Sequence, residues 1–150
     1  MFEVHCPTPD DTRAFAGKLA ALVRPDDVIV LAGGLGAGKT LFVGGLAAGL
    51  GVEEPIVSPS FVLVRQYRTG FIPLIHADVY RLSTFNEFED LDMFEQAAGG
   101  VLAIEWGHAV EAALPEDHLR IVFDIDENGG RHLRLEPFGS WVTRDWESIR

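Results

Sequence analysis

Eight consecutive residues carry the strongest chemical signal in the sequence. Residues 33–40 read GGLGAGKT and match the pattern G-x-x-x-x-G-K-[ST]. Glycines at 33, 36 and 38 permit backbone conformations that a Cβ atom disfavours, so consecutive N–H groups can curl around a polyphosphate. Lys39 can then reach the β- and γ-phosphates, and the Thr40 hydroxyl can bind Mg²⁺. We therefore predict a nucleoside triphosphate site here, with an ordinary glycine-rich turn as the weaker alternative.

Two carboxylates follow apolar runs elsewhere in the chain. Glu105 ends the run over residues 101–104, and Asp78 ends the run over residues 71–77. Phosphate-loop folds place the residue that holds Mg²⁺ through water, or that positions the attacking water, at the carboxyl end of a parallel strand. We favour Glu105 for the metal because its strand is the cleaner buried run. Asp78 competes for that role, or orders the nucleophile or a switch.

A loop containing a proline and two hydroxyl residues lies between these parts of the sequence. Residues 56–61 read IVSPSF, at the place where a phosphate-loop protein carries a switch that faces the γ-phosphate. The alternative is an ordinary surface connection. Trp106, next to Glu105, is expected to be a core residue or packing lid rather than a stacking platform for the base.

The phosphate loop needs a strand before it and a helix after it. Residues 28–32 are continuously apolar, and after the loop the apolar residues recur every four positions, which is typical of a helix. This helix contains Gly44, Gly45 and Gly49, each of which costs about 1 kcal/mol relative to alanine. The glycines predict either close packing of the helix backbone on the sheet or a mobile helix.

Other segments supply the rest of the framework. We expect a strand at Phe2–Cys6, a helix capped by Thr8 and ended at Arg24, a hairpin over 61–67 and 71–77 with Pro73 towards an edge, a helix over 84–94, a second hairpin over 119–125 and 132–136, and a tail from about residue 138. Arg131 and Arg134 in the second hairpin are expected to be surface charges rather than nucleotide contacts. The length predicts one domain over residues 1–150.

Composition and charge indicate which partners and which cellular compartment to expect. The chain has 23 Asp and Glu residues and 12 Lys and Arg residues, so its net charge at pH 7 is −11 when histidines are counted as neutral. A surface of that sign repels a phosphate backbone, so no direct nucleic-acid binding is expected, and a partner would have to carry any RNA. The lone Cys6 excludes an internal disulfide and is expected to be a small buried residue. The absence of a secretion signal and of a membrane-spanning run favours a cytoplasmic protein.

Four motifs together resemble those of a known family. The segments LAGGLGAGKT, SPSFVLV, HADVYRL and LAIEWG occur in an order and spacing similar to those of the TsaE (YjeE) family, over about residues 8–137. The resemblance implies a small bacterial ATPase that uses ATP and Mg²⁺ and works with the partner proteins TsaD and TsaB to make threonylcarbamoyladenosine in tRNA. The expected fold is α/β: a single-domain P-loop NTPase with a mixed, mainly parallel central sheet flanked by helices, plus antiparallel hairpins.

The resemblance implies roles for matching positions. These positions are Thr12, Gly33, Gly36, Ala37, Gly38, Lys39, Thr40 and Leu41 for ATP; Thr40 and Glu105 for the metal; Lys39, Asp78 and Glu105 for catalysis; and Ser58, Ser60 and Trp106 for the switch or partner contacts. The sequence departs from the family pattern at four positions, where the family usually has aspartate at Gly34, threonine at Leu41, threonine at Ser60 and glycine at Ala16. Leu41 removes one hydroxyl from the phosphate site and leaves the roles of Lys39 and Thr40 intact.

The implied function is a nucleotide-dependent step in tRNA modification. ATP and Mg²⁺ would order the switch loop and the Asp78 region and so dock the domain on TsaD and TsaB, and slow hydrolysis would reset the complex. The tRNA would be contacted only through these partners. A free-standing small-molecule kinase is disfavoured because the chain has no lid-like insertion rich in arginine. The other alternative is a nucleotide-gated binding module whose hydrolysis is incidental.

Overall fold

The computed structural model of this chain describes residues 2–34, 36–59, 64–79, 92–105 and 113–150. Its strands are β1 (Phe2–Cys6), β2 (Asp27–Ala32), β3 (Val64–Tyr67), β4 (Leu74–Asp78), β5 (Val101–Glu105), β6 (His118–Ile125) and β7 (Arg131–Phe138). Its helices are α1 (Pro9–Leu19), α2 (Lys39–Gly49) and α4 (Met93–Gln96), with 3₁₀ turns η1 (Ala20–Leu22), η2 (Gly139–Thr143) and η3 (Trp146–Ile149). In this part of the chain no helix is long and apolar enough to cross a bilayer.

The strands form one mixed sheet in the order β1-β7-β6-β2-β5-β4-β3. The four central strands, β6, β2, β5 and β4, run parallel. The outer strands pair antiparallel, β7 with β6, β1 with β7 and β3 with β4. The α/β class and both hairpins are thus confirmed, whereas the expected predominance of parallel pairing holds only for the centre of the sheet.

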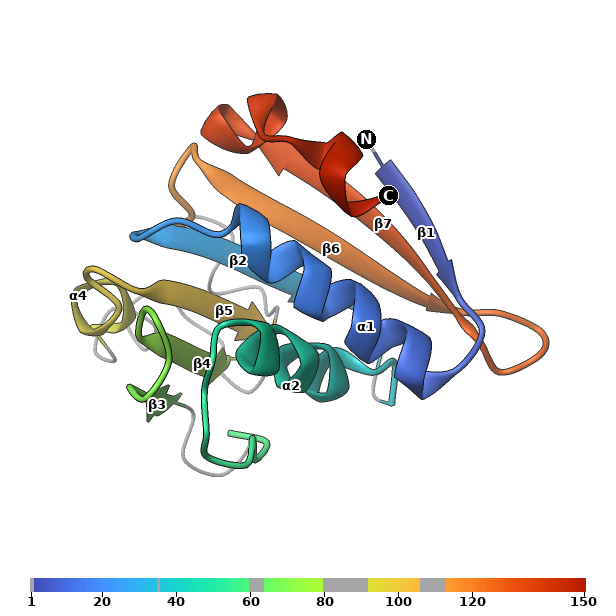
Figure 1. The fold of residues 1–150 in the computed structure, drawn as a ribbon, viewed down its shortest axis with the longest axis horizontal. Helices are drawn as coiled ribbons and strands as arrows, with labels where there is room; N and C mark the ends of the chain where they lie inside the picture. The colour runs from blue at the N-terminus through green and yellow to red at the C-terminus, as the bar shows by residue number, and fades with distance from the viewer. Residues whose placement is uncertain (1, 35, 60–63, 80–91, 106–112) are drawn as a thin grey trace.

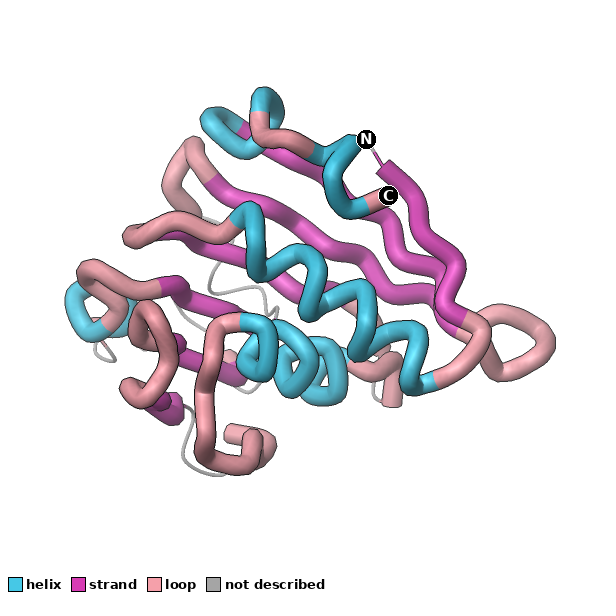
Figure 2. The backbone as a smooth tube through the Cα atoms, viewed as in Figure 1, coloured by secondary structure: helices cyan, strands magenta, loops and turns pink. Residues whose placement is uncertain are grey.

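Apolar side chains cover both faces of the central strands. In β2, Ile29 and Leu31 belong to the core cluster beneath α1 and α2, and Val28 and Val30 belong to the cluster on the opposite face. Figure 1 shows α1 and α2 lying over one face of the sheet, and Figure 2 shows the same helices in cyan over the magenta strands. Burial on both faces explains why the β2 segment is continuously apolar rather than alternating.

The first helix begins as its sequence predicts. The Thr8 side chain accepts a hydrogen bond from the Asp11 N–H, and the Asp11 carboxylate accepts one from the Thr8 N–H, with Pro9 in the first helical position. This capping box satisfies backbone donors that would otherwise lack partners. The helical path ends at Leu22, because Val23 is already extended, so the predicted end at Arg24 was two residues too late.

The glycines of α2 pack against α1. A Cβ at Gly45 would lie 2.5 Å from the Arg13 carbonyl oxygen, and a Cβ at Gly49 would lie 2.7 Å from the Gly17 carbonyl oxygen. The prediction of close packing was therefore right, but the partner is the neighbouring helix rather than the sheet. Gly44 has open space at its Cβ position.

Two further expectations concern the segments around β3 and β4. Within the described residues β3 begins at Val64, and residues 60–63 of the predicted strand lie outside them. Pro73 immediately precedes β4 and its carbonyl accepts a hydrogen bond from the Val101 N–H at 2.9 Å, so it adjoins the central strand β5 and not an edge. Most of the helix predicted over 84–94 also lies outside the described residues, and α4 covers its end.

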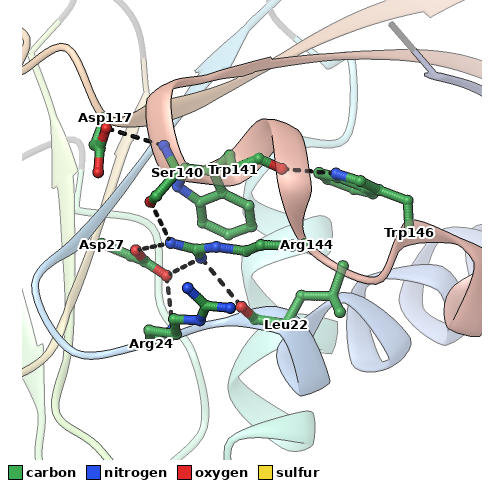
Figure 3. Close-up of polar contacts among 8 residues, drawn as sticks. All are labelled: Leu22, Arg24, Asp27, Asp117, Ser140, Trp141, Arg144 and Trp146. Carbon is green, nitrogen blue, oxygen red and sulfur yellow. Dashed lines mark hydrogen bonds and ion pairs between the residues drawn. The ribbon is translucent and has the colours of Figure 1, made fainter.

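The C-terminal tail is fixed to the start of β2 by a buried arginine (Figure 3). The Arg144 guanidinium donates two hydrogen bonds to the Asp27 carboxylate, at 2.5 and 2.8 Å, and a third to the Leu22 carbonyl oxygen at 3.1 Å. It also stacks on the ring of Trp141, 3.8 Å from its centroid, and that tryptophan is fully buried. Trp141 and Ile149 of the tail therefore belong to the core.

Candidate functional site

The glycine-rich loop joins the carboxyl end of β2 to the amino end of α2. Gly36 has a φ of 76° and Gly38 has a φ of 100°, both in the left-handed region that favours glycine. The Ala37 N–H donates a hydrogen bond to the Gly34 carbonyl oxygen at 3.2 Å, which closes a tight turn. The predicted succession of strand, loop and helix is confirmed, and the backbone explains the need for glycine.

The amino end of α2 offers a favourable environment for an anion. Within the described residues no side chain caps Gly38, and the first turn of the helix contains no acidic residue. Exposed N–H groups and the helix dipole make such an end attractive to phosphate. Lys39 adds a positive charge, and its Nζ donates a hydrogen bond to the Gly33 carbonyl oxygen at 2.7 Å across the loop.

A hydroxyl and a carboxylate meet beside the loop. The Thr40 Oγ1 atom lies 3.4 Å from Oε2 of Glu105, which ends β5. Asp78 ends the neighbouring strand β4 and lies opposite Glu105 in the parallel register. Both carboxylates are largely buried. The ends of β4 and β5 thus place Asp78 beside Glu105, and Thr40 at the start of α2 lies against Glu105.

This arrangement fits a magnesium ion. Mg²⁺ prefers oxygen ligands and usually retains several waters while binding one or two protein groups and the substrate phosphates. Thr40 and Glu105 supply two adjacent oxygen atoms where the phosphate loop ends. Thr40 and Glu105 are therefore residues that could hold the ion.

A buried histidine supports Glu105. His76 in β4 is fully buried, and its Nε2 atom lies 2.7 Å from Oε2 of Glu105. Its Nδ1 atom has no hydrogen-bond partner among the described residues. With the proton on Nε2, the imidazole would donate to the carboxylate and fix its orientation, as outer-shell partners of metal ligands do. We did not predict a role for His76, although its place two residues before Asp78 puts it on a buried central strand.

Arg131 reaches the loop from the start of β7. Its Nε donates to the Ala37 carbonyl oxygen at 2.9 Å, and its Nη2 donates to the Gly36 carbonyl oxygen at 3.0 Å. The expectation of a simple surface charge was therefore wrong for Arg131. Arg134 does behave as expected, since it is partly exposed and its Nε lies 3.4 Å from Glu136.

Titratable groups near this hairpin are also perturbed. The Asp126 carboxylate accepts a hydrogen bond from His5 at 2.7 Å and others from the N–H groups of Asn128 and Gly130, each at 2.8 Å. These bonds, led by the one from His5, hold the pKa of Asp126 below its ordinary value. Cys6 is buried as predicted, and its burial raises the pKa of the thiol.

Leu41 and the loop that follows α2 share a surface groove. A groove of about 520 Å³ is lined by Leu41 and Thr40 on α2, by Arg13 on α1, and by residues 54–56 of that loop. The Val57 N–H donates to the Tyr67 hydroxyl at 3.1 Å, which fixes this loop to β3. The first residue of the proposed switch segment, Ile56, thus lines the same groove as Thr40.

Two further predicted positions, Thr12 and Ser58, lie in the described part of the chain, and two others do not. Thr12 lies in the first turn of α1 and is fully buried, so a ligand could touch it only after neighbouring side chains moved. Ser58 is exposed on the loop after α2. Ser60 and Trp106 lie outside the described residues.

Comparisons with known proteins agree on one family. The family described as Threonylcarbamoyl adenosine biosynthesis protein TsaE matches residues 6–133. The tRNA threonylcarbamoyladenosine biosynthesis protein TsaE of Bacillus subtilis is 45% identical, with 88% of this chain and 83% of that protein covered. The protein of the same name from Treponema pallidum is 42% identical, with 83% of this chain and 93% of that protein covered. The crystal structure of Bacillus subtilis YdiB superposes with a TM-score of 0.78 at 32% identity, covering 99% of this chain and 90% of that one. This chain belongs to the TsaE family.

Proposed function

We propose that this protein binds ATP and Mg²⁺, hydrolyses ATP slowly, and acts in the cytoplasm as a nucleotide-dependent partner of TsaD and TsaB in making tRNA threonylcarbamoyladenosine. The names of its relatives support the pathway. The observation that carries the proposal is the meeting of Thr40 and Glu105 at 3.4 Å beside a glycine-rich loop. That arrangement suits a metal-bound triphosphate better than an uncharged ligand.

Each residue of the site has a distinct task in this proposal. The loop N–H groups and the amino end of α2 hold the phosphates, and Lys39 exchanges its bond to the Gly33 carbonyl for one to a phosphate oxygen. Thr40 and Glu105 would hold the metal, which would supply positive charge to the triphosphate. Asp78, on the adjacent strand end, orients the attacking water. Hydrolysis in this scheme depends on positioning and charge compensation.

The acidic surface explains why partners are part of the proposal. With a net charge of −11, the protein is repelled by a tRNA backbone, so TsaD and TsaB would hold the tRNA. The nucleotide state would change the loop after α2 and the Asp78 region, and that change would control docking. Transfer of the threonylcarbamoyl group would be the partner's reaction.

Steady-state ATP hydrolysis tests this proposal. We expect slow Mg²⁺-dependent release of phosphate by the protein alone and a clear increase when TsaD, TsaB and tRNA are added together. Omitting each component in turn identifies the one that stimulates hydrolysis. Rapid phosphate transfer to a small acceptor without partners would instead indicate a kinase. Tight ATP binding without hydrolysis in any mixture would indicate a nucleotide-gated docking module.

A further inference from the structure

We infer that Arg131 is a positioning residue that holds the phosphate loop in its binding conformation before the nucleotide arrives. This inference rests on the proposed function, since it concerns how the nucleotide site is formed. It assigns a role to a residue outside the glycine-rich motif, on a strand that begins more than ninety positions later in the chain.

All three nitrogen atoms of the Arg131 guanidinium are occupied by backbone carbonyls. Nε and Nη2 donate to Ala37 and Gly36 of the phosphate loop. Nη1 donates to Gly129 at 2.6 Å and to Gly130 at 3.3 Å, both in the turn between β6 and β7. The side chain therefore connects the hairpin turn to the loop, and its bonds are already committed to positioning the backbone.

These bonds determine which way two peptide groups of the loop face. In a trans peptide the C=O and the following N–H point in opposite directions. With the Gly36 carbonyl turned towards Arg131, the Ala37 N–H points away and closes the turn onto the Gly34 carbonyl oxygen. With the Ala37 carbonyl turned the same way, the Gly38 N–H also points away from Arg131. In the proposed function this N–H, at the amino end of α2, is one of the donors to the phosphates.

The hairpin turn is itself firmly held, so it can serve as an anchor. The Asp126 carboxylate accepts hydrogen bonds from the N–H groups of Asn128 and Gly130, and from His5 on β1. Gly130 is closely packed, because a Cβ there would lie 2.7 Å from Oδ2 of Asp126 and 3.1 Å from the Cα atom of Pro7. A cation fixed to this turn also adds a favourable charge next to a polyphosphate.

Backbone dynamics and ADP affinity of three variants test the inference. Arg131→Ala removes the bonds, and Arg131→Lys keeps the charge but loses the planar fork. Arg134→Ala is the matched control, because this arginine lies on the same strand and pairs with Glu136 at the surface. In nucleotide-free Arg131→Ala we expect the ¹⁵N order parameters of residues 36–38 to fall from about 0.85 to below about 0.6, with those of β2 unchanged.

The affinity for ADP should fall when the phosphate loop becomes more mobile. We expect the dissociation constant of Arg131→Ala to rise by about 10- to 100-fold, that of Arg131→Lys to rise by a smaller factor, and that of Arg134→Ala to stay unchanged. Order parameters that change only in the hairpin, or not at all in either Arg131 variant, would overturn the inference. So would unchanged ADP affinity in both Arg131 variants when the wild-type protein binds ADP. If the wild-type protein binds no ADP, the proposed function fails, and the nucleotide-free order parameters still decide whether Arg131 holds the loop.

Discussion

Replacing Glu105 with glutamine is expected to lower Mg²⁺-dependent ATP hydrolysis by about 10²- to 10³-fold, because one preorganised electrostatic contact to the reacting groups is lost. The amide keeps the volume of the side chain and one oxygen near Thr40 and His76, so the fold should survive. It removes the negative charge through which this residue would retain the metal. The measurement is phosphate release at saturating ATP over a series of Mg²⁺ concentrations.

A surface glutamate provides the control for this prediction. Glu136 on β7 pairs with Arg120 and Arg134 at the surface, and Glu136→Gln should hydrolyse ATP like the wild type. Binding of ADP without Mg²⁺ should be nearly the same in both variants, since the loop and Lys39 are intact. Wild-type hydrolysis by Glu105→Gln at all Mg²⁺ concentrations would contradict the role assigned to Glu105.

Replacing Arg144 with alanine is expected to lower the free energy of unfolding by about 3–5 kcal/mol, because removing one partner of a buried ion pair leaves a buried charge uncompensated. Asp27 is 7% exposed, and among the described residues its carboxylate would keep only the bond from the Arg24 N–H, at 2.6 Å. The stacking of the guanidinium on Trp141 would also be lost. Urea denaturation followed by tryptophan fluorescence measures the change.

The matched control for the tail is its other arginine. Arg150 is exposed, lies 3.4 Å from Glu147 and is 5.0 Å from the centroid of the Phe2 ring, so Arg150→Ala should change the free energy of unfolding by less than about 1 kcal/mol. Equal and small effects of the two substitutions would show that the tail does not stabilise the core. A large effect of Arg144→Ala alone is the expected result.

Local signals in the sequence were sufficient to predict the central part of the site. The spacing of Gly36, Gly38 and Lys39 predicted the loop, because the need for left-handed backbone is a property of those residues themselves. Glu105 and Asp78 could be selected because each ends an apolar run, and parallel strands end at the same edge of a sheet. Their adjacency in the structure follows from the direct pairing of β4 with β5.

Contacts that depend on long-range register could not be predicted in this way. Arg131 meets the phosphate loop only because β6 lies between β2 and β7 in the sheet, and nothing near residue 131 specifies that order. The same holds for His76, whose role depends on the strand that lies beside it. A charged side chain such as Arg144 is most often exposed. Its burial against Asp27 therefore could not be predicted from the neighbouring residues in the sequence.

The packing partner of α2 also could not be predicted from the sequence. Its glycines indicated close approach of another backbone, but sequence periodicity does not say whether that backbone belongs to a sheet or a helix. The structure places Gly45 and Gly49 against α1, so the two helices approach each other closely at these positions. Gly44, on the open side, lines the groove next to Thr40 and Leu41.

The most direct test of the account is multiple-turnover formation of threonylcarbamoyladenosine in a mixture of this protein, TsaD, TsaB, tRNA, ATP and the threonylcarbamoyl donor. Lys39→Ala removes the only side-chain cation that contacts Gly33 in the described part of the loop, and the control Lys18→Ala alters the exposed face of α1. We predict repeated rounds of modification with the wild type and Lys18→Ala, and none beyond the first with Lys39→Ala. Sustained modification by a folded, partner-bound Lys39→Ala would contradict the claim that the nucleotide state of this protein controls docking and that hydrolysis resets the complex.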